Sequence, residues 1–174
     1  GTYLGWKDYS GGRRYYSLSK DKKYAYMNYG VNVVHGTPMC FDSDGYLMTS
    51  GTEDDTAIKR LGSNYYAVDY EGEVTENDWE ELDGFLYYFD NQGRMLRNCK
   101  YKIDGEYYLF DTDGTVYQGN SYTEFFDFHS NTYAVRTDGT VVEGKCAYVD
   151  GEKYYFDRYS VVQKNRLIKI GKKK

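Results

Sequence analysis

Internal repetition is the strongest constraint on this chain, because similar segments recur about every 21 residues. Three of them align without gaps: LDGFLYYFDNQG at 82–93, IDGEYYLFDTDG at 103–114 and VDGEKYYFD at 149–157. A first turn lies at the Asp-Gly pair, and a second turn follows nine residues later, as from Gly84 to Gly93. Weaker copies begin at Gly36, Ser63, Ser130 and Gly151, and a seventh, eroded copy begins at Gly12.

Each repeat has the sequence pattern of a β-hairpin. Asp-Gly between aromatic and β-branched runs predicts a tight turn, because glycine adopts positive φ without strain. Six residues after the first turn, an aspartate able to bond turn amides recurs, with Arg136 as the exception. A single hairpin is marginally stable, so the hairpins must stack. We predict an all-β solenoid of six to seven stacked β-hairpins, with a period of about 21 residues and no helix of consequence.

Alternation along the strands predicts which side chains are buried. Positions three, five and eleven after the first turn are apolar or aromatic in every repeat, as in Tyr87, Phe89 and Met95. Positions two and four are mixed, as in Leu86 and Tyr88. We therefore expect the first set to face the core and the second set to face outward.

The composition favours binding over several other function classes. The 23 tyrosines argue against disorder, and a net charge of -5 argues against a nucleic-acid partner. Three cysteines fit neither a disulfide framework nor a metal site. There is no membrane span and no signal peptide, so we expect any export signal to lie in a longer parent protein. We expect a lead-in at 1–11, the repeat array at 12–165 and a basic tail at 166–174.

The unit DG-x-x-YYF-D-x-x-G, with Trp79 five residues before Gly84, resembles the bacterial cell-wall-binding repeat. That superfamily includes choline-binding modules, glucan-binding regions of secreted glucosyltransferases and repeats of large glucosylating toxins. The resemblance covers about residues 30–165 and is best at 79–118 and 149–157. It implies an extracellular or cell-surface module. Its partner would be a wall polysaccharide, a choline-bearing teichoic acid or a host or extracellular glycan.

The resemblance also implies where ligands would bind. The family's choline boxes hold a quaternary ammonium among three rings, which come from the positions five before and two after the first turn. Rings remain here only at Trp79 and Phe125 in the first position and at Tyr65 and Tyr107 in the second. Most boxes are therefore incomplete, and a Lys at the second position in one repeat is similar to glycan-binding subtypes.

The predicted site lies where Tyr65 of one hairpin meets Trp79 of the next. Tyr88 would form a third wall, and Glu80 or Glu81 would supply a carboxylate. A second candidate combines Tyr107 with Tyr101 or Tyr122, which could substitute in a shifted register. The alternative role for Trp79 is to cover the junction between hairpins.

Other chemistry has little support in the sequence. The two DxDG turns at 42–45 and 111–114 lack the later oxygen ligands of a calcium loop. His35 and His129 are isolated, and no nucleophile or phosphate-loop motif is present. We expect no enzyme activity, cofactor or metal. The predicted function is attachment of an exported bacterial protein to cell-wall polymer or carbohydrate through outward aromatic residues. The alternative is a structural spacer or protein-interaction array whose ligand sites have decayed.

Overall fold

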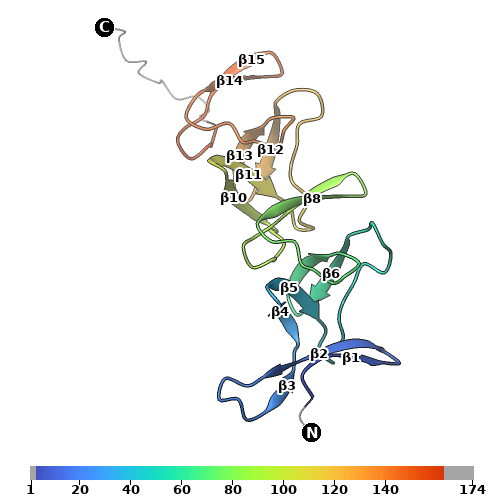
Figure 1. Ribbon diagram of the computed structural model, residues 1–174. Helices are drawn as coiled ribbons and strands as arrows, with labels where there is room; N and C mark the ends of the chain where they lie inside the picture. Colours follow the sequence, from blue (N-terminus) through green and yellow to red (C-terminus); the bar gives the residue numbers. More distant parts are fainter. Residues whose placement is uncertain (1–2, 163–174) are drawn as a thin grey trace. The chain divides into compact units, whose positions relative to one another are not determined.

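The computed structural model describes residues 3–162, which form fifteen β-strands and no helix (Figure 1). They divide into two compact units that meet in sequence between Leu96 and Arg97. The strands of the first unit are Gly5–Tyr9 (β1), Gly12–Leu18 (β2), Ala25–Met27 (β3), Gly30–Val34 (β4), Thr37–Phe41 (β5), Ala57–Leu61 (β6), Asn64–Val68 (β7), Asp78–Leu82 (β8) and Phe85–Phe89 (β9). Those of the second are Cys99–Ile103 (β10), Glu106–Phe110 (β11), Glu124–Phe128 (β12), Asn131–Val135 (β13), Cys146–Val149 (β14) and Glu152–Tyr155 (β15).

The strands pair only locally, which confirms the predicted hairpin array. β1, β2 and β3 form one antiparallel sheet, and the other strands form six two-stranded hairpins. Each hairpin is closed by a two-residue turn, and both turn residues have positive φ at Asp83 and Gly84 (54° and 78°) and at Asp104 and Gly105 (49° and 92°). Two positive φ values match the right-handed twist of the flanking strands. The first hairpin turns at residues 10–11, one residue earlier than the predicted start at Gly12.

The aspartate after each hairpin organises the second turn, as predicted. Asp90 Oδ1 accepts hydrogen bonds from the amides of Gln92 and Arg94, both at 2.9 Å. The equivalent carboxylates of Asp42, Asp69, Asp111 and Asp157 each accept two turn amides. Where Arg136 replaces the aspartate, Asp138 accepts the amide of Thr140 at 2.9 Å instead. Carboxylate–amide bonds therefore account for the DxDG motifs.

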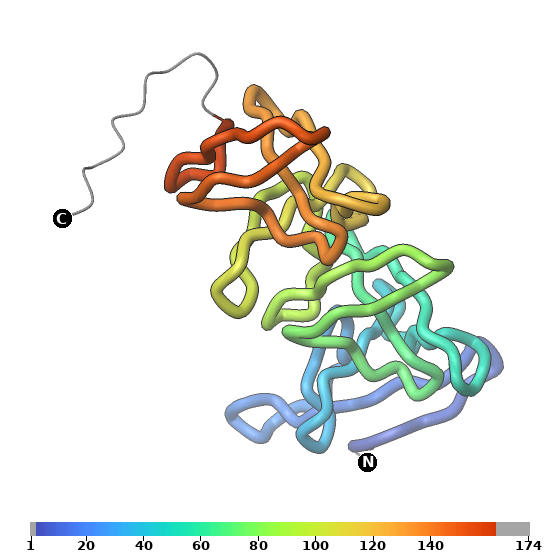
Figure 2. Tube along the Cα trace, turned by 90° about the horizontal axis from the view of Figure 1, so that it is seen from above, coloured from blue at the N-terminus to red at the C-terminus, as the bar shows by residue number. Residues whose placement is uncertain are grey.

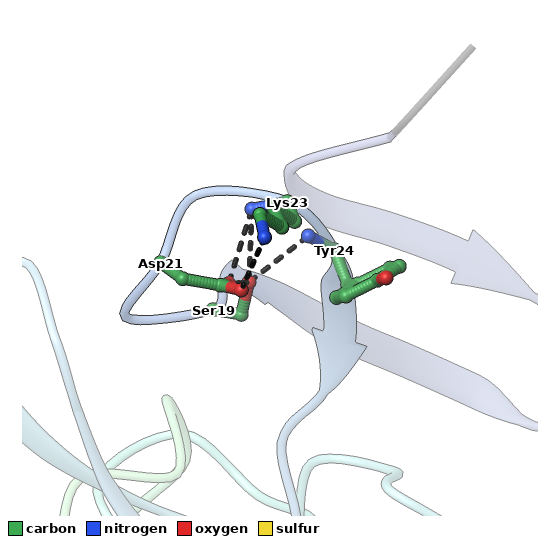
Figure 3. Close-up of polar contacts among 4 residues, drawn as sticks. All are labelled: Ser19, Asp21, Lys23 and Tyr24. Carbon is green, nitrogen blue, oxygen red and sulfur yellow. Dashed lines mark hydrogen bonds and ion pairs between the residues drawn. The ribbon is translucent and has the colours of Figure 1, made fainter.

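The first repeat replaces this turn with a longer loop at 19–24 (Figure 3). Ser19 Oγ donates to Asp21 Oδ1 at 2.7 Å and accepts the amides of Lys23 and Tyr24 at 3.2 and 2.9 Å. The hydrogen bond from Ser19 lowers the pKa of Asp21. The Lys23 ammonium lies 3.9 Å from the same carboxylate. Side-chain bonds thus stabilise a loop that lacks the usual aspartate and glycine.

Figure 2 follows the backbone through the successive hairpins of each unit. Main-chain hydrogen bonds connect these hairpins within each unit. The donor is the amide of the residue eleven positions after the first turn of one hairpin. The acceptor is the main-chain carbonyl of the residue two positions after the first turn of the preceding hairpin. The bonds in the first unit are Leu47 to Arg13 (2.8 Å), Val74 to Pro38 (2.9 Å) and Met95 to Tyr65 (2.8 Å). Those in the second are Val141 to Tyr107 (2.8 Å) and Val162 to Thr132 (3.2 Å). Among the six later hairpins, variation in length lies in the connections that follow the closing bridge, chiefly 48–56 and 117–123.

Position five of each of the six later hairpins is a fully buried apolar side chain of the core. These residues are Phe41, Val68, Phe89, Phe110, Val135 and Phe156, all at 0% exposure. Their burial confirms the predicted core face for position five.

The prediction that position four faces outward is wrong. Cys40, Ala67, Leu109 and Ala134 are fully buried, and Tyr88 is 5% exposed. In a stacked array this face is covered by the next hairpin, and Ala67 packs with Phe89 just as Ala134 packs with Phe156. Side chains on both faces of the second strand are therefore buried near its C-terminal end. The small side chains of Ala67 and Ala134 leave space for the phenylalanine at position five of the next hairpin.

The predicted boundaries of the array stay predictions, but two structural facts bear on them. β1 lies inside the predicted lead-in at 1–11 and pairs with β2. The predicted tail at 166–174 lies outside the described residues.

Two glycines of one repeat test how the hairpins stack. Both have positive φ, but a Cβ on Gly93 would collide with Val74 Cγ1 of the preceding repeat, whereas a Cβ on Gly84 meets nothing within 4 Å. We expect Gly84→Ala to cost about 1 kcal/mol of unfolding free energy from backbone strain, and Gly93→Ala about 2 to 4 kcal/mol. Urea unfolding measures both variants, and equal losses would contradict this account of stacking.

Asp90 provides a pH-dependent test of the second turn. Burial opposes its ionisation, but hydrogen bonds from Arg94 and the turn amides outweigh burial and lower its pKa. A lowered folded-state pKa stabilises the fold above the unfolded pKa of about 4, and this contribution is lost as the pH falls further. We expect Asp90→Asn to cost about 1 to 2 kcal/mol at neutral pH.

The cost should shrink in acid, where the parent carboxylate is also protonated. Urea unfolding of both proteins at neutral pH and below pH about 4 measures this convergence. Asp113→Asn, in the exposed part of an equivalent turn, is the control and should change stability little at either pH. A constant difference across pH would contradict the assigned role.

Candidate ligand-binding junctions

Side chains from two successive hairpins meet at each junction between repeats. Three positions contribute: five before a first turn, two after it, and three after the next first turn. Residues at these positions are Trp6, Arg13 and Met39; Val31, Pro38 and Tyr66; Ile58, Tyr65 and Tyr87; Lys100, Tyr107 and Tyr133; and Phe125, Thr132 and Tyr154. Shared clefts, packing clusters and ring contacts join members of each set. The junctions within a unit are therefore structurally equivalent, but their side chains differ in charge and aromatic character.

The first junction opens into a cleft of about 590 Å³. The Trp6 indole and the half-exposed Tyr70 ring line it, together with the polar side chains of Arg13, Glu71 and Glu73. The Arg13 guanidinium lies 4.6 Å from the centre of the Trp6 ring and is also bonded to Asp8 at 3.0 Å. The cleft therefore offers ring edges and hydrogen-bonding groups of both signs, while a cation of the chain itself covers one face of the indole.

A second cleft of about 560 Å³ lies beside Ile58 and Tyr87. The exposed Phe85 ring contributes to its wall. Its charged lining residues, all within the described part of the chain, are the carboxylates of Asp55, Glu81 and Asp83. This cleft combines aromatic rings with negative charge. Glu81 lines this cleft, which contains neither Tyr65 nor Trp79, whereas Glu80 accepts the Thr75 hydroxyl at 2.5 Å. The role of either carboxylate in the predicted site stays a prediction.

Trp79 packs on Tyr88 across its own hairpin. The rings are 5.0 Å apart at 71°, and Trp6 packs on Tyr15 in the same way at 5.1 Å and 67°. Tyr88 is buried and donates its hydroxyl to Asn77 Oδ1 at 3.1 Å. Tyr88 is therefore a packing residue rather than the outward wall that alternation predicted.

Tyr65 lies in a cluster with Ile58, Ala67, Tyr87 and Phe89. Its main-chain carbonyl accepts the Met95 amide, so its strand position is fixed by the next repeat. The proposed pairing of Tyr65 with Trp79 across one ligand remains a prediction.

Tyr107 forms a cage with Tyr133 of the next hairpin. The Lys100 ammonium lies 4.2 Å from the centre of the Tyr107 ring and 5.1 Å from that of Tyr133. Tyr101 and Tyr122, the predicted partners, are 43% and 56% exposed. Sequence reasoning missed Tyr133 because it lies one hairpin away, although position three is aromatic in five of the six later repeats.

Burial shifts the pKa of two titratable side chains near the junctions. Burial lowers the pKa of the Lys100 ammonium, against the opposing attraction of Glu143 and Asp157. Burial also raises the pKa of the Cys40 thiol to about 11, so this cysteine is a neutral core residue. Among residues 3–162, no three metal-ligating side chains of the His, Cys, Asp and Glu types come together.

Comparison with known proteins identifies the fold. No family model and no curated protein matches the chain. Choline-binding protein F from Streptococcus pneumoniae aligns at a TM-score of 0.69 with 18% identity, over 95% of this chain and 54% of that one. CbpJ from Streptococcus pneumoniae TIGR4 aligns at 0.64 with 19% identity, over 92% and 48%. The choline-binding domain of CbpL from Streptococcus pneumoniae aligns at 0.59 with 17% identity, over 93% and 78%.

These alignments confirm the repeat fold that the sequence resemblance predicted. The chain spans about half the length of choline-binding protein F and of CbpJ. At 17–19% identity the likeness concerns the arrangement of the backbone.

Trp79 offers a test of packing against ligand binding. Because its ring packs on a buried tyrosine, we expect Trp79→Ala to cost about 2 to 4 kcal/mol of unfolding free energy. Tyr24→Ala, which removes an exposed ring outside the junctions, is the control and should cost less than about 0.5 kcal/mol. Thermal and urea unfolding measure both. An unchanged stability for Trp79→Ala, with loss of wall retention, would instead identify Trp79 as a ligand wall.

Proposed function

We propose that this chain is a non-catalytic module that attaches a larger exported bacterial protein to cell-wall polymer or carbohydrate. The observation that carries the proposal is the pair of open clefts at hairpin junctions in the first unit, each lined by aromatic rings and polar side chains. Ligand sites combine apolar surface with a few polar groups in this way. The fold supports a wall partner, because choline-binding protein F was crystallised with a peptidoglycan analogue.

The two clefts suit different parts of a wall polymer. At the first, Tyr70 offers an exposed ring beside Arg13, Glu71 and Glu73, which can bond sugar hydroxyls. At the second, the carboxylates beside Phe85 and Tyr87 suit a cationic substituent such as a quaternary ammonium. A choline-bearing teichoic acid presents both groups, and a neutral glycan would use the first cleft alone. Tyr101, Tyr107 and Tyr122 are proposed contacts for sugar in the second unit, where Lys100 already lies over the Tyr107 ring.

The proposed location is the cell surface, with no cofactor required. Within residues 3–162, no helix is long and apolar enough to cross a membrane.

One observation favours the alternative of a structural spacer. At two junctions a cationic side chain of the protein itself lies over the aromatic rings, Arg13 on Trp6 and Lys100 on Tyr107. In this alternative, junctions filled in this way would contribute to the fold instead of binding ligand.

Retention on purified cell walls tests the proposal. We expect the chain to be pulled down by walls, and Tyr70→Ala or Phe85→Ala to reduce retention at least several-fold with little change in melting temperature. Tyr24→Ala is the matched control, because this exposed ring lies in neither cleft.

Free choline separates the ligand classes. Release of the chain by choline assigns the acidic cleft to a quaternary ammonium, and retention unaffected by choline assigns a glycan. Failure to bind walls, glucans and host glycans alike would overturn the proposal and leave the spacer.

A further inference from the structure

The side chain of Lys100 is bound by its own protein as a ligand would be. Its ammonium lies over the rings of Tyr107 and Tyr133 and donates to the carbonyl of Tyr159 at 2.7 Å and to Ser160 Oγ at 3.1 Å. Tyr133 is 7% exposed and Ser160 is fully buried. Two ring faces and two oxygen acceptors therefore surround one charge, which is how proteins hold a desolvated cation.

The position of Lys100 is the one that holds Trp6 in the first repeat and Trp79 in the fourth. The register confirms the equivalence, because Lys100 faces Leu109 as Trp79 faces Tyr88. A cation thus replaces a ring at the wall of this junction and turns back over the two rings that remain. Burial lowers the pKa of the Lys100 ammonium, and the attraction of Glu143 and Asp157 opposes this effect.

We propose that Lys100 is an internal ligand that closes the Tyr107–Tyr133 cage to external cations, and that the cage takes a small quaternary ammonium group once this side chain is removed. This inference deepens the proposed function, because it identifies the junction of Tyr107 and Tyr133 as one that accepts no cationic substituent of the ligand. It depends on the cage geometry and not on wall binding.

The first junction supports the same principle with different residues. Arg13, at position two, lies over the Trp6 ring at position minus five, so a second junction also combines a protein cation with an aromatic ring. The cation comes from position two in the first junction and from position minus five in the junction of Lys100. The contact between a cation and the junction rings therefore does not require one particular position in the repeat.

Removal of Lys100 should expose the cage. In Lys100→Ala we expect tetramethylammonium to bind at least about tenfold more tightly than to the parent, with chemical-shift changes centred on the Tyr107 and Tyr133 rings. Tetramethylammonium should also raise the melting temperature of this variant while leaving that of the parent unchanged. Lys102→Ala is the matched control, since the Lys102 ammonium also lies over the Tyr107 ring, at 5.0 Å, but Lys102 is exposed whereas Lys100 is half-buried.

Binding of tetramethylammonium to those two rings in the parent would overturn the proposal. So would a folded Lys100→Ala that does not bind it. If Lys100→Ala fails to fold, Lys100→Met keeps most of the side-chain volume without the charge. The parent titration, followed at the same ring resonances, then still decides whether the cage is closed. Because this probe is soluble, a negative wall pull-down leaves the result unaffected.

Discussion

Each hairpin in a unit is fixed by a main-chain hydrogen bond to the hairpin before it. In a two-residue hairpin, the pair next to the turn is hydrogen-bonded and the following pair is not, so the second residue directs its carbonyl away from its own partner strand. Val74 donates to this carbonyl on Pro38, and Met95 donates to the one on Tyr65. Pro38 fits there because this position needs an acceptor and no N–H donor.

This bond also explains where the rings meet. It sets position two of one hairpin against the returning segment of the next, which brings Tyr107 beside Tyr133 and Tyr65 beside Tyr87. The aromatic junctions are therefore a consequence of backbone register. Their chemistry varies because the register is maintained by main-chain atoms and by position five, leaving the junction side chains free to differ.

The repeat, the turns and the core at position five could be predicted from sequence, because each depends on short-range spacing or alternation. Position four could not, since Cys40 and Ala67 are covered by side chains of the next hairpin, whose placement alternation does not report. Of the two rings in the cage, the sequence predicts Tyr107 as a site residue but not Tyr133. In the sequence, Lys100 only marks a first position that has no ring, whereas in the structure its ammonium lies over the two rings of its own junction.

The longer connections have a consequence for how such a chain can change in length. In the six later hairpins, cross-strand pairs and turn hydrogen bonds set the register from the first turn to the closing bridge, so an inserted residue there would shift the contacts that follow in that hairpin. Residues 48–56 follow the bridge at Leu47 and precede β6, outside that interval. New sequence enters the array at such connections without disturbing its periodicity, which makes 51–55, an exposed stretch, the natural attachment point for a reporter or a grafted domain.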